Sequence, residues 1–454
     1  RALHACHIGY IELSRYDEAL RLLDDALVLA RALGDLARES YLLLSISQIY
    51  NDLDDNRRAL EYSAQSLQLA QASGAIYREA HALYEVGKDA MYLGDWEQAL
   101  AALDQSTTIY TSLGLTRRLV MPLWAQGMVY QMNGNDASSE QAYRRALAIT
   151  QSPEHLNPPT AMDTLKQLGL LYQVQGRDDE ALEAFGHAIE LADQYDFRHW
   201  RPILLGMQAR LLQRRGRIAE AAILYRSAIA GIEAIRGQIE IEAIQISLFG
   251  TSQYIYESLV LFCLEHETQA AAFAYAEQAR ARAFLDLLAR QSPELYGAAD
   301  QPTVTLAEIQ ARLGESELLL EYFTTGVLPR EDHWLTRIPQ HNARLRDAVV
   351  PARKIILFAI THDWHDAYEI KVDPNTLYPS RHSEDPVLDM LRIDGVARWL
   401  YDRLLVPVEH VLSKCRQIYV IPHGPLHYIP FTALRRPDGR YLLDAVGRRC
   451  HLRP

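Results

Sequence analysis

The sequence predicts a helical solenoid over the first half of the chain and a separate α/β domain over the second. Three observations support this. A 40-residue repeat runs through residues 1–232, its phase is lost after residue 237, and strand and helix patterns alternate from residue 304. The chain has 454 residues, of which 49% are hydrophobic. It can therefore bury more than one core, and a disordered chain is excluded.

Charge balance and cysteine content narrow the class of protein. Lys and Arg number 46 and Asp and Glu 58, so the net charge is −12, which disfavours a nucleic-acid partner. The four Cys residues are too few and too scattered for a disulfide framework or a structural zinc site. We expect a reducing, cytoplasmic location and no cofactor or metal. No apolar run approaches the ~18 residues of a membrane span, so no membrane contact is expected.

A small residue after a turn marks each repeat. The marker positions are Ala19, Ala59, Ala99, Ser139, Ala181 and Ala221. Their spacings of 40, 40, 40, 42 and 40 residues are too regular to arise by chance. Because residue 1 is Arg and not Met, we expect a fragment whose number of preceding repeats is unknown.

Each repeat is predicted to form two helices joined by a short turn. Twelve residues before most markers stands a small residue that lets two helices approach closely: Gly87, Gly127, Gly169 and Ala209. Between the helices stands a glycine suited to a left-handed helix stop: Gly94, Gly134, Gly176 and Gly216. Asp95 and Asn135 follow two of these glycines and are candidate caps of the next helix.

This pattern is similar to tetratricopeptide (TPR) repeats, in the variant with helices longer than the 34-residue norm. The resemblance covers residues 1–232. It implies a right-handed superhelix in which each repeat buries its face against its neighbours. It also implies a concave groove that binds a peptide or a partner protein.

The resemblance places one side chain of each first helix on the concave side. These residues are Ile11, Asn51, Met91, Gln131, Gln173 and Gln213. Four of the six are amides, which both donate and accept, so they can hold an extended peptide backbone. The alternative, that helix surfaces often carry Gln, stays open. Lys88, Arg210 and Arg214 also map to the groove and are candidates to attract an acidic partner.

Residues 233–290 stay helical but break the repeat phase. Two long helices, 243–265 and 269–289, are predicted to cap the solenoid and connect it to the second half. Arg280 and Arg282 on the second helix are expected to be solvated or salt-bridged. Residues 291–303 contain Pro and Gly and form a linker.

From residue 304 the pattern is that of an α/β domain. Thr305 is a candidate cap of a short helix. Strands are predicted at 318–323, 354–361, 367–372 and 417–421, and a helix bent near Pro407 at 396–412. The strands at 354–361 and 367–372 are expected to pair as a hairpin. Residues 326–353 contain many charged residues and three Pro and are predicted to be a long insertion.

These segments resemble the start of a CHAT domain, the caspase/separase-like peptidase domain that often follows TPR arrays in bacteria. The motifs are Leu320-Glu321-Tyr322-Phe323, Leu400-Tyr401-Asp402, Leu405-Val406-Pro407 and the run from Ile421 to Leu434 that contains Pro430-Phe431. The resemblance covers residues 237–454 and implies a mostly parallel sheet flanked by helices. It also implies a catalytic His that activates a Cys thiol for attack on a peptide carbonyl.

In that family both catalytic residues lie downstream of the Pro-Phe motif, beyond a strand near residues 441–452. We therefore carry over no catalytic residue and expect 304–454 to be the incomplete N-terminal portion of the domain. His423-Gly424 and Cys450 are of the same residue types as the family's catalytic His-Gly and Cys. However, His423 precedes the Pro-Phe motif, and Cys450 lacks the neighbouring Ser, Thr and Gly. His362-Asp363-Trp364-His365-Asp366 could suggest a metal site, but it falls at the predicted hairpin turn and lacks further ligands nearby.

Two functions follow from these resemblances. The first is a partner- or peptide-binding array coupled to a caspase-like cysteine endopeptidase, with proteolysis regulated by protein binding. It requires a His and a Cys from beyond residue 454, so this chain alone would be inactive. The alternative is a non-enzymatic TPR scaffold with a pseudo-peptidase domain. Both expect a protein or peptide in the groove.

Overall fold

The computed structural model describes residues 15–236, 242–291, 304–327, 342–377, 394–442 and 450–452. The chain divides into two compact units. The first comprises residues 1–249 together with 328–349, and the second comprises 250–327 together with 350–454. The segment 328–349 therefore belongs to the helical unit, although it lies in sequence between two strands of the other unit.

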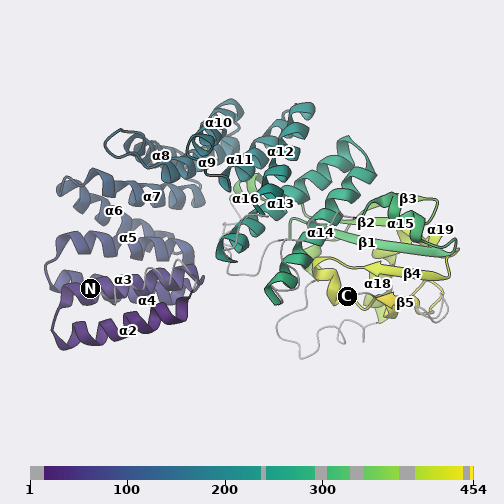
Figure 1. The fold of residues 1–454 in the computed structure, drawn as a ribbon, viewed down its shortest axis with the longest axis horizontal. Helices are drawn as coiled ribbons and strands as arrows, with labels where there is room; N and C mark the ends of the chain where they lie inside the picture. Colours follow the sequence, from purple (N-terminus) through teal and green to yellow (C-terminus); the bar gives the residue numbers. More distant parts are fainter. Residues whose placement is uncertain are drawn as a thin grey trace. The chain divides into compact units, whose positions relative to one another are not determined.

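The first unit is a stack of antiparallel helix pairs (Figure 1). Its elements in the array are α2 (Tyr16–Ala32), α3 (Leu36–Asp52), α4 (Asn56–Ala72), α5 (Ile76–Leu93), α6 (Trp96–Ser112), α7 (Val120–Met132), α8 (Asp136–Thr150), α9 (Pro158–Gln175), α10 (Asp178–Gln194), α11 (Trp200–Arg214) and α12 (Ile218–Arg236). A short 3₁₀ turn, Thr116–Leu119, precedes α7. The predicted helical solenoid is confirmed.

The marker residues explain why these helices pack so closely. All six are completely buried. At Gly127 of α7, an added Cβ atom would lie 2.4 Å from Cε1 of Tyr143 on α8. The same arrangement recurs at Gly169, where Phe185 of α10 takes the place of the tyrosine. The aromatic ring that fills the gap thus comes from the second helix, four residues after the marker.

The turns between paired helices follow the sequence prediction. Gly94, Gly134, Gly176 and Gly216 all have positive φ, between 73° and 79°. Asp95 accepts a hydrogen bond from the Gln98 backbone N–H at 3.1 Å, and Asn135 accepts one from Ser138 at 3.3 Å. Both predicted N-caps are confirmed.

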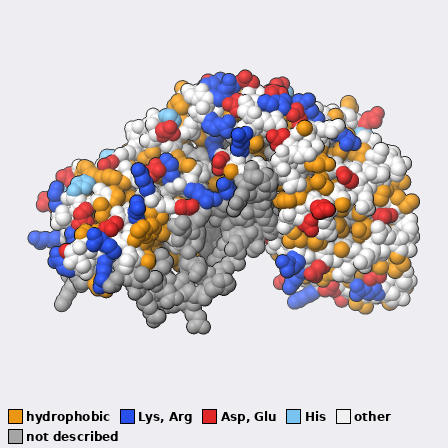
Figure 2. All heavy atoms as spheres, turned by 180° about the vertical axis from the view of Figure 1, so that it is seen from behind, with side chains coloured by type: hydrophobic (Ala, Val, Ile, Leu, Met, Phe, Trp, Pro, Cys, Tyr) orange, Lys and Arg blue, Asp and Glu red, His pale blue; other side chains and the backbone are white. Residues whose placement is uncertain are grey.

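Charged side chains of both signs are scattered over the face of the molecule that Figure 2 shows. Ion pairs also bridge neighbouring helices in the first unit. Arg31 of α2 lies 2.7 Å from Glu39 of α3, and Arg214 of α11 lies 3.3 Å from Asp178 of α10. Exposed pairs of this kind each contribute only about 0–1 kcal/mol, so buried packing carries most of the stability.

The second unit contains a five-stranded sheet. Its strands are β1 (Glu317–Thr325), β2 (Lys354–Ile360), β3 (His365–Ile370), β4 (Gln417–Ile421) and β5 (Cys450–Leu452). Their order is β3-β2-β1-β4-β5. β1 and β4, and β4 and β5, are parallel, whereas β1 and β2, and β2 and β3, are antiparallel. The described sheet is therefore mixed rather than mostly parallel, because the short turn 361–364 makes β2 and β3 a hairpin.

Helices cover both faces of this sheet. On one face, Tyr322 of β1 donates a hydrogen bond to the Leu404 carbonyl at the end of α18 (Asp394–Leu404). On the other face, Phe358 of β2 meets Phe273 of α14 (Gln269–Gln291), with ring centroids 5.4 Å apart. Because alternate residues of a strand point to opposite faces, β1 is buried on both.

The remaining elements of the second unit match their predictions closely. Thr305 and Glu308 form a capping box on α15 (Leu306–Arg312). The predicted bent helix consists of α18, a 3₁₀ turn at Val406–Val408 and α19 (Glu409–Leu412). α13 (Glu242–His266) precedes α14 in the chain. Among the described residues, no helix has the length and apolarity needed to cross a membrane.

Candidate functional site

A candidate site in the first unit is a cavity of about 400 Å³ in the helical array. It is lined by Met91, Tyr92, Trp96, Trp124, Met128, Met132, Asp163, Lys166, Gln167 and Trp200. All but Trp96 come from α5, α7, α9 and α11, which are the first helices of four consecutive repeats. Stacking the repeats therefore brings the same face of each first helix to one place.

The walls of the cavity are mostly apolar. Three tryptophans and three methionines contribute to them. Aromatic rings give large contact areas at small entropic cost, and methionine adapts its shape to different ligands. These are the properties of a site that accepts an apolar anchor side chain.

Two polar features lie within this apolar lining. Lys166 forms an ion pair with Asp163, and its ammonium group lies 4.8 Å from the centre of the Trp200 ring. The indole Nε1 of Trp124 is buried and has no hydrogen-bond partner among the described residues. An unsatisfied buried donor costs about 1–3 kcal/mol, so a bound acceptor would recover part of that energy.

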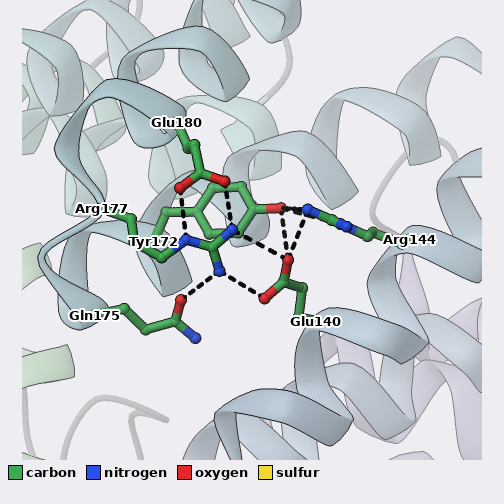
Figure 3. A network of polar contacts seen from close by, with 6 residues as sticks. All are labelled: Glu140, Arg144, Tyr172, Gln175, Arg177 and Glu180. Carbon is green, nitrogen blue, oxygen red and sulfur yellow. Dashed lines mark hydrogen bonds and ion pairs between the residues drawn. The ribbon is translucent and has the colours of Figure 1, made fainter.

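A polar network in the same array joins three helices (Figure 3). The guanidinium of Arg177, which precedes α10, lies over the Tyr172 ring at 4.3 Å. It also pairs with Glu140 of α8 at 2.7 Å and with Glu180 of α10. Arg144 of α8 binds both Glu140 and the Tyr172 hydroxyl. The network fixes the end of α9 between α8 and α10.

Sequence reasoning missed this network, although the repeats contain a signal for it. The pairs Arg15 and Glu18, Arg177 and Glu180, and Arg217 and Glu220 occur at the same place before the marker. Each forms an ion pair between residues three apart.

In the second unit, the buried polar groups gather around β1. Glu321 is completely buried and pairs with Arg280 of α14 at 2.5 Å. Arg280 also contacts Glu277 at 2.8 Å, so its predicted salt bridge is present. Burial raises the pKa of Glu321 to about 8, even though Arg280 acts to lower it. At neutral pH this carboxyl group therefore holds a proton more tightly than an exposed one.

His423 lies at the carboxyl end of β4. Its Nδ1 accepts a hydrogen bond from the Thr324 backbone N–H at 3.0 Å, and its ring stacks on Phe323. Burial, followed by the charge of Arg280, lowers the pKa of His423 to about 3. The imidazole is therefore neutral at pH 7 and carries its proton on Nε2.

Comparison with known families finds a match within each unit. A tetratricopeptide-repeat model matches residues 78–152 and 160–234, and a second one matches residues 2–37. The model of the CHAT domain matches residues 394–449. The chain is a TPR-repeat protein with a CHAT domain. The comparison with curated proteins found no match.

Several solved structures are similar to the TPR array. The apo form of RapI is 14% identical, with 64% of this chain and 98% of that chain covered at a TM-score of 0.47. BtubC from P. vanneervenii is 17% identical, with 43% and 80% covered at a TM-score of 0.40. The Rap conjugation gene regulator of plasmid pLS20, solved with the Phr* peptide, is 14% identical. The match covers 65% of this chain and 75% of that chain at a TM-score of 0.43.

Two of the predicted amides of the TPR groove bind tyrosines of their own repeat. Gln131 accepts a hydrogen bond from the Tyr143 hydroxyl at 2.9 Å, and Gln213 accepts one from Tyr225 at 3.0 Å. In the intervening repeat the equivalent residue is Phe185, which has no hydroxyl. The carbonyl oxygen of Gln173 is consequently buried without a hydrogen-bond partner among the described residues.

Asn51 and Lys88 belong to a buried polar cluster of the TPR array. Asn51 donates to Asp89 at 2.8 Å, and Lys88 lies 2.5 Å from Glu85. Burial alone would raise the pKa of Glu85, but Lys88 and then His81 outweigh it and lower the pKa to about 2. Lys88 is therefore engaged by a carboxylate of its own helix.

The two other basic groove residues are also engaged. Arg214 pairs with Asp178 of the preceding repeat, as described above. Arg210 donates to the main-chain carbonyls of Asp347 and Val349, at 2.8 and 2.5 Å. Ile11 lies outside the described residues. The structure thus brings Arg210, but not Arg214, into contact with the segment 342–349.

The geometry of the CHAT domain separates His423 from Cys450. Cys450 pairs in register with Ile418, whereas His423 follows the opposite end of β4. Five residues of strand separate the two positions along the sheet, or about 16 Å at ~3.3 Å per residue. Of the His362–Asp366 run, the first three residues lie in the turn between β2 and β3, whereas His365 and Asp366 begin β3. The described residues contain no cluster of three metal-ligating side chains.

Proposed function

We propose that the concave face of the TPR array binds a peptide or an exposed protein segment, and that the cavity lined by Trp124 and Trp200 receives its anchor side chain. The observation that carries this proposal is the cavity of about 400 Å³ formed by the first helices of four consecutive repeats. A volume of that size suits one or two apolar side chains rather than a whole domain.

The lining favours a particular ligand chemistry. The apolar walls select an aromatic or long aliphatic side chain, and the buried indole N–H of Trp124 requires an acceptor such as a peptide carbonyl. The paired charges of Lys166 and Asp163 offer both signs at the cavity wall. Together these groups suit an extended or helical segment with one large apolar residue.

Binding in the groove would then regulate the CHAT domain. In the complete protein, a His and a Cys downstream of the Pro430-Phe431 motif would perform cysteine-peptidase chemistry, with the thiolate as the nucleophile. Support for this coupling is the presence of both families in one chain. Deleting residues 1–232 from the complete protein should abolish partner-dependent cleavage.

A scaffold without enzymatic activity is the second candidate. Its specific support is that His423 is bound to Thr324 and that its position after β4 is out of register with that of Cys450 on β5. The sequence that follows Pro454 discriminates the two candidates. A strand ending in His-Gly and a later Ser-x-Cys-x-Thr-Gly-like element favour the peptidase.

A selection experiment tests the binding proposal. A library of random 12-residue peptides displayed on phage is selected on the full chain, and enriched peptides are measured against Trp200→Ala. The control is Trp399→Ala, because Trp399 is exposed on α18 of the CHAT domain. We expect W200A to weaken binding by roughly 30-fold, which corresponds to the ~2 kcal/mol of an aromatic hot spot, and W399A to have no effect.

Two results would contradict the proposal. One is a library that yields no enriched peptide on the folded full chain. The other is a set of peptides that bind the wild type, W200A and W399A equally well. Circular dichroism of both variants confirms that the helical array is retained.

A further inference from the structure

The TPR array already binds a short helix, and that helix comes from the same chain. α16 (Ala343–Val349) lies in sequence between β1 and β2 of the second unit but packs against α9 of the array. It belongs to the compact unit of the array. The predicted insertion 326–353 therefore contains an ordered helix with a defined binding place.

Polar bonds hold this segment at its amino end. The Asn342 side-chain amide donates to the carbonyl of Gln131 at 2.6 Å and to that of Met132 at 3.3 Å. Both carbonyls belong to the last turn of α7, and that of Gln131 also accepts a hydrogen bond from the Gly134 backbone N–H at 3.1 Å. Met132 also lines the cavity described above. Asn342 thus caps α7 from outside the repeat.

Arg210 holds the segment at its carboxyl end. Its guanidinium donates to the carbonyls of Asp347 and Val349, which belong to the last turn of α16. A cation at this end of a helix also interacts favourably with the helix dipole. Arg210 is one of the groove positions that the sequence singled out as a partner-binding residue.

Between these two ends, one face of the segment is apolar and buried. Asn342, Leu345 and Ala348 are 7%, 2% and 4% exposed, whereas Arg344 and Asp347 are exposed. Positions three and six residues apart lie on the same side of a helix. The segment is therefore a small amphipathic helix, with its apolar stripe and its end groups all directed to the array.

The path of the chain makes this helix a tethered ligand. Thr325 at the end of β1 donates to the Ala352 carbonyl at 2.6 Å, and the Gly326 N–H donates to Glu257 at 2.8 Å. These bonds join the two ends of the insertion within the second unit. Covalent attachment gives such a ligand a millimolar effective concentration.

We propose that the groove at the carboxyl end of α7 and at Arg210 is a docking site for a short amphipathic helix, and that residues 342–349 occupy it as a built-in ligand. The external partner that competes for the site carries an amide side chain at its amino end and apolar residues three and six positions later. Binding of that partner releases the connection between β1 and β2. The proposal goes beyond the cavity proposed above and does not require its anchor pocket.

Hydrogen exchange of the full chain tests the docking without any partner. Peptides that cover residues 342–350 should be protected in the wild type, and Arg210→Ala should accelerate their exchange at least 10-fold. The matched control is Arg214→Ala, which removes an arginine from the same helix that pairs with Asp178 instead. Free-peptide exchange rates in the wild type, or equal effects of R210A and R214A, would overturn the proposal.

A competition experiment tests whether the site is open to an external ligand. The probe is a fluorescein-labelled synthetic peptide with the sequence of residues 342–349. Its affinity for the full chain should rise by roughly 10- to 100-fold when Leu345→Asp expels the tethered copy, because that copy no longer competes at millimolar effective concentration. Asp347→Asn, on the exposed face, should leave the affinity at the wild-type value.

The same experiment has a second control, and two results would contradict the proposal. Adding R210A to L345D should remove the gained affinity, since the carbonyl contacts are lost. Equal affinity for wild type and L345D, or no binding by L345D at any concentration, would refute tethered competition. A failed peptide selection on the Trp200 pocket leaves these outcomes unchanged, so the two proposals fail separately.

Discussion

Replacing Gly127 by alanine tests how the TPR repeats pack. The new Cβ would lie 2.4 Å from Cε1, 2.5 Å from Cδ1 and 2.9 Å from Cζ of Tyr143. Carbon atoms in contact normally stand about 3.5–4.0 Å apart, so roughly 1 Å of separation must be gained. Tyr143 is completely buried and cannot move aside. We therefore expect α7 and α8 to be forced apart.

The expected cost can be worked out from two opposing effects. Overpacking a core costs about 1–3 kcal/mol, and three ring atoms within 3 Å place this site at the upper end. Alanine recovers about 1 kcal/mol of helix propensity over glycine. The net destabilisation is about 2 kcal/mol. Gly186→Ala on α10 is the matched control, because nothing lies within 4 Å of its added Cβ and it should stabilise by about 1 kcal/mol.

Hydrogen exchange of the α7 and α8 amides in the full chain is the assay, since repeat arrays open locally. A loss of about 2 kcal/mol accelerates exchange roughly 30-fold in G127A, and G186A slows it in α10. Gly87→Ala should cost less than G127A, because its nearest neighbour is the flexible side chain of Leu103. Protection in G127A equal to or above the wild-type value would refute this account of the packing.

Two further predictions concern buried polar groups. Because the pKa of Glu321 is about 8 in the folded protein against 4.5 for the free side chain, its stabilising contribution is full below pH 4.5 and is lost as pH rises through 8. Exchange of β1 amides, corrected for intrinsic rates, should therefore accelerate from pH 5 to 9 in the wild type but not in Glu321→Gln; a flat wild-type profile would contradict this. Tyr143→Phe should destabilise its repeat by about 1–3 kcal/mol because Gln131 loses its donor, whereas Phe185→Tyr should stabilise by up to about 1 kcal/mol by giving Gln173 one. Urea unfolding of both variants measures the change in the free energy of unfolding. If both substitutions changed it in the same direction, the tyrosine hydroxyl would not be what stabilises the repeat.

Much of the fold could be predicted because its determinants are local. The markers at 40-residue spacing, and the glycines that end each first helix, specify a helix pair without knowledge of distant contacts. The strands could also be predicted, because five of the six residues in the run 318–323 are hydrophobic, and this strand is buried and takes the central place in the sheet. The mixed strand directions could not be predicted from the sequence, because they depend on which distant segments pair.

The candidate site could be predicted only in part, because its chemistry depends on contacts between repeats. The repeat phase identifies the positions Gln131 and Gln213. Each binds a tyrosine twelve residues later, and predicting that bond requires knowledge of the angle between the two helices. Lys88 had the charge expected of a groove residue, yet Glu85, one turn away, already neutralises it. The cavity itself is assembled from four repeats and has no local signature.

The segment 342–349 joins these observations into one argument about regulation. Leu345 and Ala348 give it the apolar stripe of a docking helix, and Arg210 uses main-chain carbonyls that any helix of similar length would present. Recognition through carbonyls sets few demands on the partner's sequence, so selectivity must come from the amide at Asn342 and the two apolar positions. An external helix with the same three features therefore meets a site that is already formed, and has only to outcompete a ligand attached to both β1 and β2.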